Sequence, residues 1–141
     1  MNQPVTKGPP PVRPKTLQDF LVDLARNDPR AGKAATLAEA GDSKRPYGLA
    51  VMLEGRETRW QINARSAERD DFDQPERPVE GGPISMDGPW AEGAEGWLAQ
   101  LIAGSGSKQI QDIEQWSLRN EPKAGLTVKC YSGAWLYLRA L

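Results

Sequence analysis

The clearest pattern of apolar and polar positions lies in residues 47–65, where it predicts a β-hairpin. The first half is apolar on both faces, a turn follows at residues 54–57, and the second half alternates strictly. One face of this second strand is apolar. The other face carries a row of four polar residues: Arg59, Gln61, Asn63 and Arg65. The first strand is expected to lie inside a sheet, because both of its faces are apolar.

A second hairpin is predicted at residues 125–141. Leu126, Val128 and Cys130 share one face of its first strand, and another apolar run follows a turn at residues 132–134. We expect this hairpin to complete the sheet that the first one begins.

Two segments repeat their apolar residues at helical spacing. Residues 16–27 form the first, with Thr16 as the expected N-cap, and residues 88–103 form the second. Gly93 and Gly96 would weaken the second helix, so another backbone is expected to pack closely against it there.

Two further segments are less regular. Residues 34–40 are interpreted as a short helical turn, whereas residues 107–120 fit either a helix or a strand. The fold class expected from these elements is α+β. A mainly antiparallel sheet of four to five strands, built from two hairpins, would carry two to three helices on one face. No internal repeat is visible in the sequence.

The chain is expected to divide into a tail and one domain. Residues 1–15 are rich in proline and predict a disordered tail, and residues 16–141 predict a single α+β domain. The short PxxP pattern at residues 11–14 fits a flexible linker, and the alternative is a docking peptide for an SH3-like groove.

Charge is distributed unevenly, although the net charge of the 141 residues is −1. Residues 1–48 carry eight Lys or Arg against five Asp or Glu, whereas residues 66–100 carry nine acidic against two basic residues. Residues 66–88 are therefore interpreted as a long acidic loop within the domain. Its carboxylates could hold Mg²⁺ or Ca²⁺, but the ligand order of an EF-hand is missing, which favours a hydrated loop.

The composition removes several kinds of chemistry. The chain has no histidine and one cysteine, which excludes histidine-based acid–base catalysis, the usual Ser or Cys triads, disulfides within the chain and cysteine zinc sites. No nucleotide-binding or hydrolase motif occurs. We therefore expect a protein that is not an enzyme and that has no cofactor and no metal. The lack of a long apolar run and of a secretory signal predicts no membrane association and a cytoplasmic location.

Five tryptophans are more than a small core needs, since an indole N–H seeks a partner when it is buried. Our leading hypothesis is a non-enzymatic protein-interaction module: a small adaptor, inhibitor or immunity-type protein. It would bind a protein partner through an aromatic patch flanked by the acidic loop. The candidate residues are Trp90, Trp97, Asp70, Asp71 and Asp73. A homo-oligomer is a further possibility.

The alternative function is nucleic-acid binding by the polar strand face of Arg59, Gln61, Asn63 and Arg65 together with the basic tail. A third reading, less favoured, is an enzyme that relies on carboxylates or a metal.

Overall fold

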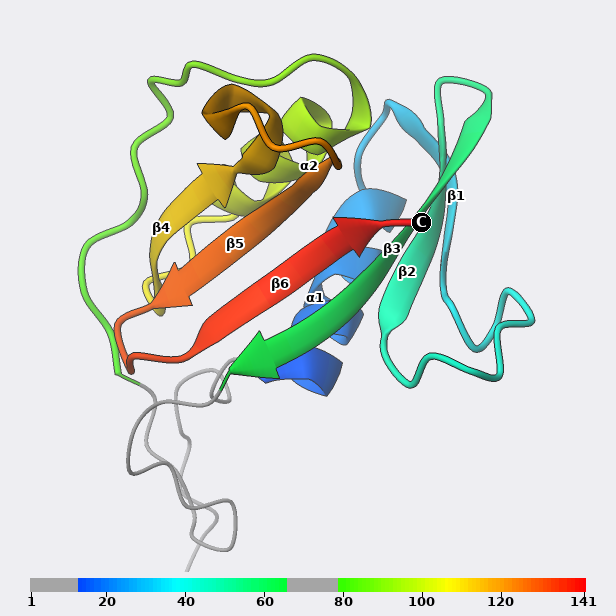
Figure 1. The fold of residues 1–141 in the computed structure, drawn as a ribbon, viewed down its shortest axis with the longest axis horizontal. Coiled ribbons are helices and arrows are strands. Elements are labelled where there is room, and N and C mark those ends of the chain that lie inside the picture. Colours follow the sequence, from blue (N-terminus) through cyan, green and yellow to red (C-terminus); the bar gives the residue numbers. More distant parts are fainter. Residues whose placement is uncertain (1–12, 66–78) are drawn as a thin grey trace, which may run out of the picture.

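Every strand in the described part of the chain belongs to one antiparallel sheet (Figure 1). The computed structural model describes residues 13–65 and 79–141. The elements, in chain order, are α1 (Pro14–Arg26), β1 (Ala31–Thr36), β2 (Gly48–Leu53), β3 (Arg56–Arg65), α2 (Gly93–Ala103), β4 (Ile110–Gln115), the 3₁₀ helix η1 (Trp116–Arg119), β5 (Gly125–Cys130) and β6 (Trp135–Ala140). The strands lie in the order β1-β2-β3-β6-β5-β4. The expected α+β class is confirmed.

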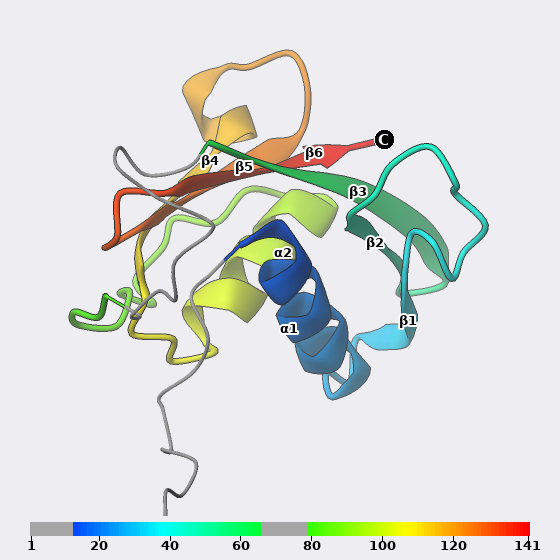
Figure 2. The ribbon, with the colours of Figure 1, turned by 90° about the horizontal axis from the view of Figure 1, so that it is seen from below.

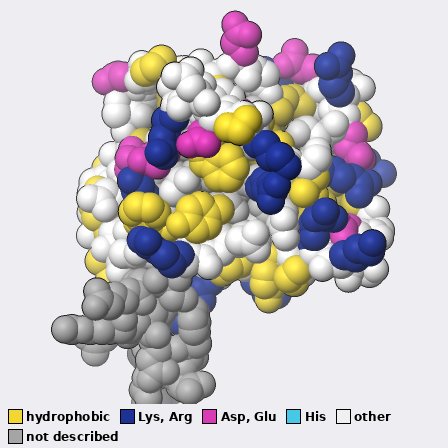
Figure 3. Space-filling view, in the orientation of Figure 1, with side chains coloured by type: hydrophobic (Ala, Val, Ile, Leu, Met, Phe, Trp, Pro, Cys, Tyr) yellow, Lys and Arg dark blue, Asp and Glu magenta, His cyan; other side chains and the backbone are white. Residues whose placement is uncertain are grey.

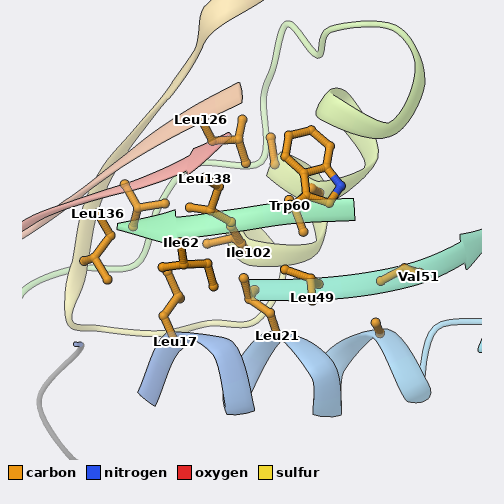
Figure 4. Packing of buried hydrophobic residues seen from close by; sticks show 14 of the residues in the cluster. Leu17, Leu21, Leu49, Val51, Trp60, Ile62, Ile102, Leu126, Leu136 and Leu138 are labelled. Carbon is orange, nitrogen blue, oxygen red and sulfur yellow. The ribbon is translucent and has the colours of Figure 1, made fainter. Parts of the chain in front are cut away.

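Both α-helices cover the same face of the sheet, and the opposite face has no α-helix over it; among the described elements, only the short η1 lies on that side, beside β5 (Figure 2). Helix α1 repeats its apolar residues at intervals of three to four, so Leu17, Leu21 and Ala25 are buried together. Figure 4 shows Leu17 and Leu21 reaching from α1 toward Ile62 and Leu49 on the sheet. The core therefore lies between the helices and one side of the sheet.

Both predicted hairpins are present. Strands β2 and β3 are joined by Glu54 and Gly55, whose φ angles of 50° and 84° suit a two-residue turn of type I′. Strand β2 lies between β1 and β3, as its two apolar faces predicted. Strand β6 pairs with β3, with Ile62 opposite Leu138, so the second hairpin does complete the sheet.

The sheet has six strands instead of the expected four to five, because two segments that were not assigned to strands from the sequence form β1 and β4. The helical turn predicted at residues 34–40 is wrong in its first half, because Ala31–Thr36 forms strand β1, which pairs along β2. Pairing with β2 stabilises the strand through backbone hydrogen bonds, which cannot be predicted from the residue types of the segment itself. The second half of the segment is a hydrogen-bonded turn, in which the Ala40 amide donates to the Thr36 carbonyl at 3.0 Å. Residues 107–120, left open as helix or strand, contain strand β4 followed by η1.

Both helices begin at residues other than those expected. Helix α1 starts at Pro14, with Arg13 as N-cap instead of Thr16, because a proline is tolerated in the first helical turn. Helix α2 starts at Gly93, and the loop before it is attached to β4 by the last residue of that strand. The Gln115 side chain accepts a hydrogen bond from the Ala91 amide at 2.6 Å and donates one to the Pro89 carbonyl at 2.9 Å.

The predicted close backbone approach occurs at Gly96 but not at Gly93. A Cβ at Gly96 would lie 1.6 Å from the Ala91 carbonyl oxygen, whereas one at Gly93 would meet nothing within 4 Å. Gly93 instead has a φ of 73°, which is a backbone conformation that favours glycine.

The fold consists of two units with the same element order. The units α1-β1-β2-β3 and α2-β4-β5-β6 each place a helix before a three-stranded meander. Strands β3 and β6 are antiparallel neighbours in the middle of the sheet. The strand order is consequently symmetric about the line between them, as expected for a local two-fold axis through the sheet (Figure 1).

The correspondence extends to single hydrogen bonds. In the first unit the Gln18 side-chain oxygen accepts a bond from the Gly48 amide at 3.0 Å, and in the second the Glu95 carboxylate accepts one from the Gly125 amide at 2.9 Å. From Gln18 to Glu95 and from Gly48 to Gly125 the spacing is 77 positions in each case. We conclude that the described chain contains a structural repeat that the sequence pattern did not reveal.

Candidate functional site

The candidate site is the sheet face that neither α-helix covers, which we call the outer face; η1 lies over its β5 end. The strand registers assign a set of residues to it. They are Lys33, Ala35, Ala50, Met52, Glu57, Arg59, Gln61, Asn63, Arg65, Asp112, Glu114, Thr127, Lys129, Trp135, Tyr137 and Arg139. Figure 3 looks onto this face: apolar side chains gather near its middle and Lys and Arg side chains lie around them.

Trp135 is held between two cations. It lies opposite Arg65 on β3 and opposite Lys129 on β5. The Arg65 guanidinium carbon lies 4.2 Å, and the Lys129 ammonium 4.4 Å, from the ring centroid. Since β3 and β5 flank β6 on opposite sides, the two cations approach the ring from opposite sides. Such contacts contribute about 0.5–1 kcal/mol each at exposed sites and hold the ring in one orientation.

A network of polar contacts orders the second half of the face. The Glu114 carboxylate pairs with Lys129 at 2.8 Å and with Arg119 at 2.6 Å. Next to it, the Trp116 indole donates a hydrogen bond to the Thr127 hydroxyl at 2.9 Å. The Trp116 ring also occupies the space beside Gly125, where a Cβ would come within 2.3 Å of it. This packing fixes η1 over strand β5.

The polar row predicted on β3 lies on the outer face. Asn63 and Arg65 are exposed, and Arg59 and Gln61 are half-buried. Arg59 is paired with Glu57 at 2.8 Å, which raises the pKa of the guanidinium through a hydrogen bond and charge attraction. The row is extended by β6, since Gln61 lies opposite Arg139 and Asn63 opposite Tyr137.

The predicted aromatic patch lies elsewhere. Trp97 is 2% exposed and belongs to the core, and Trp90 is half-buried and packs against the core. Trp60 is also buried, with 1% exposed. Neither Trp60 nor Trp97 has a hydrogen-bond partner for its indole N–H among the described residues. The expectation that buried tryptophans would find such partners is therefore wrong for these two.

The remaining candidates, Asp70, Asp71 and Asp73, lie outside the described residues, as do residues 1–12 of the tail predicted at residues 1–15. The last two residues of that predicted tail, Pro14 and Lys15, belong to α1 instead. Within residues 13–65 and 79–141, no three side chains of His, Cys, Asp or Glu are grouped as a metal site would require. Over the same ranges, neither helix has the length and the apolar character needed to cross a bilayer.

Sequence reasoning missed Trp135, Tyr137, Arg139 and Lys129 as site residues. Their alternation with Leu136 and Leu138 was visible and would have placed the first three on one face. What it could not show was the pairing of β6 with β3, which joins them to the polar row from 70 residues earlier.

Cys130 is buried in the core, and burial raises the pKa of its thiol to about 11. At pH 8 the thiolate fraction is then about 100-fold smaller than that of a cysteine with the ordinary pKa of 9.0. We expect the folded protein to react with Ellman's reagent at least that much more slowly than the protein in 6–8 M urea, which exposes the thiol. Equal rates in the two conditions would contradict the burial of this side chain.

A groove of about 690 Å³ lies on the helical side, between α1 and the segment that follows α2. Its volume is in the range of small-molecule sites, and Phe20 contributes apolar surface to it. Asp19 on its rim pairs with Lys15 at 2.9 Å, and the hydrogen bond from Lys15 lowers the pKa of the carboxyl. None of the residues proposed from the sequence lines this groove.

Comparisons with known proteins give no family, because no family model, no curated protein and no solved structure matches this chain significantly.

Proposed function

We propose that this chain is a non-enzymatic protein-interaction module that binds a protein partner through its outer face. The observation that carries the proposal is the cluster of Trp135, Tyr137 and Arg65 on the sheet face that neither α-helix covers. Tryptophan, tyrosine and arginine are the residues that most often dominate the energy of protein interfaces. Trp135 is already held in place by its two cations, so little side-chain entropy would be lost on binding.

Charge suggests the kind of surface that the partner presents. The outer face carries five cationic side chains against three acidic ones, and two of the cations, Arg59 and Lys129, are paired with acids of the same face. Of the other three cations, Arg65 and Arg139 lie on the strands around Tyr137, and Lys33 lies on β1. A partner with apolar side chains bordered by carboxylates would complement this face. An adaptor, an inhibitor or an immunity-type protein fits this mode of binding.

The double variant Trp135→Ala/Tyr137→Ala is expected to lose the partner. The change removes both aromatic side chains from the centre of the proposed interface, where a truncation typically costs more than about 2 kcal/mol per anchor. The full chain, tagged and expressed in the cells it comes from, would be recovered and analysed by native mass spectrometry. The wild-type chain should carry a second protein in a fixed ratio, and the double variant should carry less than about one tenth of it.

Met86→Ala is a matched control, since Met86 is 51% exposed and lies in the segment before α2, off the outer face. This variant should retain the partner. Urea midpoints would show that all three chains fold. The proposal fails if the double variant keeps its partner, or if the wild-type chain is recovered alone. If the wild-type chain is recovered as a homo-oligomer and the double variant as a monomer, the partner is a second copy of this chain.

Nucleic-acid binding is the second candidate, favoured by the row of Arg59, Gln61, Asn63 and Arg65 on the same open face. It is less favoured for two reasons. Both sides of the Trp135 ring are occupied by cations, so no base can stack on it without displacing one, and Arg59 is already paired with Glu57. RNA or DNA in the wild-type peak, lost as salt is raised, would support this candidate instead.

A further inference from the structure

A small hollow lies on the outer face between β1, β2 and β3, with a volume of about 240 Å³. Its floor is formed by Ala35, Ala50 and Met52, which the strand registers place side by side. The loop after β1 closes one end, where the Arg59 guanidinium lies 3.5 Å from the Ala40 carbonyl oxygen. The hollow is thus continuous with the proposed interface, because Arg59 belongs to both.

The repeat in the fold shows why the hollow exists. Ala35 and Ala50 are opposite one another in the first unit, and Glu114 and Thr127 are opposite one another at the matching place in the second. There the space is filled, by the ion pair of Glu114 with Lys129 and by Trp116 packed over β5. The first unit has only methyl groups at those positions. The hollow is therefore a difference between two otherwise similar halves of one face.

We propose that this hollow receives one apolar side chain of the protein partner, of about the size of leucine or phenylalanine, which anchors the complex. The inference rests on the function proposed above. The volume lies below the 300–1,000 Å³ that is usual for small-molecule sites, so a single side chain fits it better than a free ligand. Anchor side chains that fill pockets in this way dominate many protein interfaces.

The charges around the hollow agree with an uncharged occupant. Lys33 and Arg59 lie on its rim together with Glu39 and Glu57. Arg59 pairs with Glu57 at 2.8 Å, and Glu39 accepts a hydrogen bond from the Thr36 amide at 3.0 Å and lies 3.9 Å from Arg26. With two cations and two carboxylates, the rim offers no net charge to a phosphate or to a carboxylate ligand.

The test uses two small probes on the full-length protein, N-acetyl-L-leucine amide and N-acetyl-L-phenylalanine amide. Titrated in ¹⁵N–¹H correlation spectra, at least one should produce saturable shifts at the amides of Ala35, Ala50 and Met52. N-acetylglycine amide, which has no side chain, should not. The absence of saturable shifts with both probes, or equal shifts with the glycine compound, would overturn the proposal.

Two variants connect the hollow to the partner. Ala35→Leu fills the hollow from its floor, and Ala64→Leu adds the same side chain at an exposed place at the end of β3, outside the hollow. Ala35→Leu should weaken probe and partner binding at least about tenfold, and Ala64→Leu should change neither. If Trp135→Ala/Tyr137→Ala releases the partner but Ala35→Leu does not, the anchor is wrong and the proposed function stands. If the probes bind while no partner depends on the outer face, the proposed function fails.

Discussion

Replacing Glu95 with alanine is expected to lower the free energy of unfolding by about 3 kcal/mol. The Glu95 side chain rises from α2, is 3% exposed, and accepts three hydrogen bonds. The donors are the Ser117 amide at 2.9 Å, the Ser117 hydroxyl at 2.8 Å and the Gly125 amide at 2.9 Å. Alanine would release η1 from α2 and leave the buried Gly125 N–H without an acceptor, a loss of about 1–3 kcal/mol by itself. Urea unfolding followed by tryptophan fluorescence would measure the change.

Glu92→Ala is the matched control, because Glu92 is exposed, lies at the N-cap of the same helix and makes no side-chain capping bond. It should change the stability by less than about 0.5 kcal/mol. Glu95→Gln should fall between the two, since the amide oxygen can keep the bond to Gly125, as Gln18 does with Gly48 in the first unit. A Glu95→Ala protein as stable as Glu92→Ala would refute this role of the carboxylate.

The second large effect is expected from Gly96→Ala, which should destabilise the protein by about 3 kcal/mol. In an ordinary helix the same change stabilises by about 1 kcal/mol, because alanine is the better helix former. Here the added Cβ would lie 1.6 Å from the Ala91 carbonyl oxygen and 2.7 Å from its carbon. These are backbone atoms fixed by the bond of the Ala91 amide to Gln115, so the loop before α2 would have to move. Calorimetry should show a midpoint lower by about 10 °C.

Gly104→Ala provides the comparison at the other end of α2. Gly104 has a right-handed φ of −74°, and the nearest atom to an added Cβ is the Gln100 carbonyl oxygen at 3.1 Å, with the flexible Met86 side chain beyond it. The thermal unfolding midpoint of the Gly104→Ala protein should differ from that of the wild type by no more than about 3 °C. The close approach at Gly96 would be disproved if Gly96→Ala melted at or above the wild-type temperature.

The hairpins could be predicted because their information is local. The alternation of Trp60 and Ile62 with Arg59 and Gln61, and the turn at Gly55, specify a strand pair without reference to the remaining chain. Strand β1 could not be predicted in the same way. Its residues are mostly small, and their strand conformation depends on hydrogen bonds to β2.

Half of the candidate site could be anticipated. The row from Arg59 to Arg65 was identified as a polar strand face from its alternation, and it lies on the outer face. The aromatic half was predicted at Trp90 and Trp97, around α2. This prediction failed because the spacing of apolar residues shows which side of a helix is apolar but not how deeply that side is buried. Trp97 is enclosed in the core, whereas Trp135 stands on the open side of the sheet.

The sequence by itself determined the fold class, both hairpins, both helices to within a few residues, and the face on which each residue of β3 lies. These properties follow from periods of 2 and 3.6 residues, which are local. Only the tertiary structure decided the six-stranded order, the two matching units and the meeting of Trp135 with Arg65. Those features depend on contacts between residues far apart in the chain. The repeat was also hidden because matching positions of the two units hold different residue types in the same backbone geometry, such as Gln18 with Glu95 and Ala35 with Glu114.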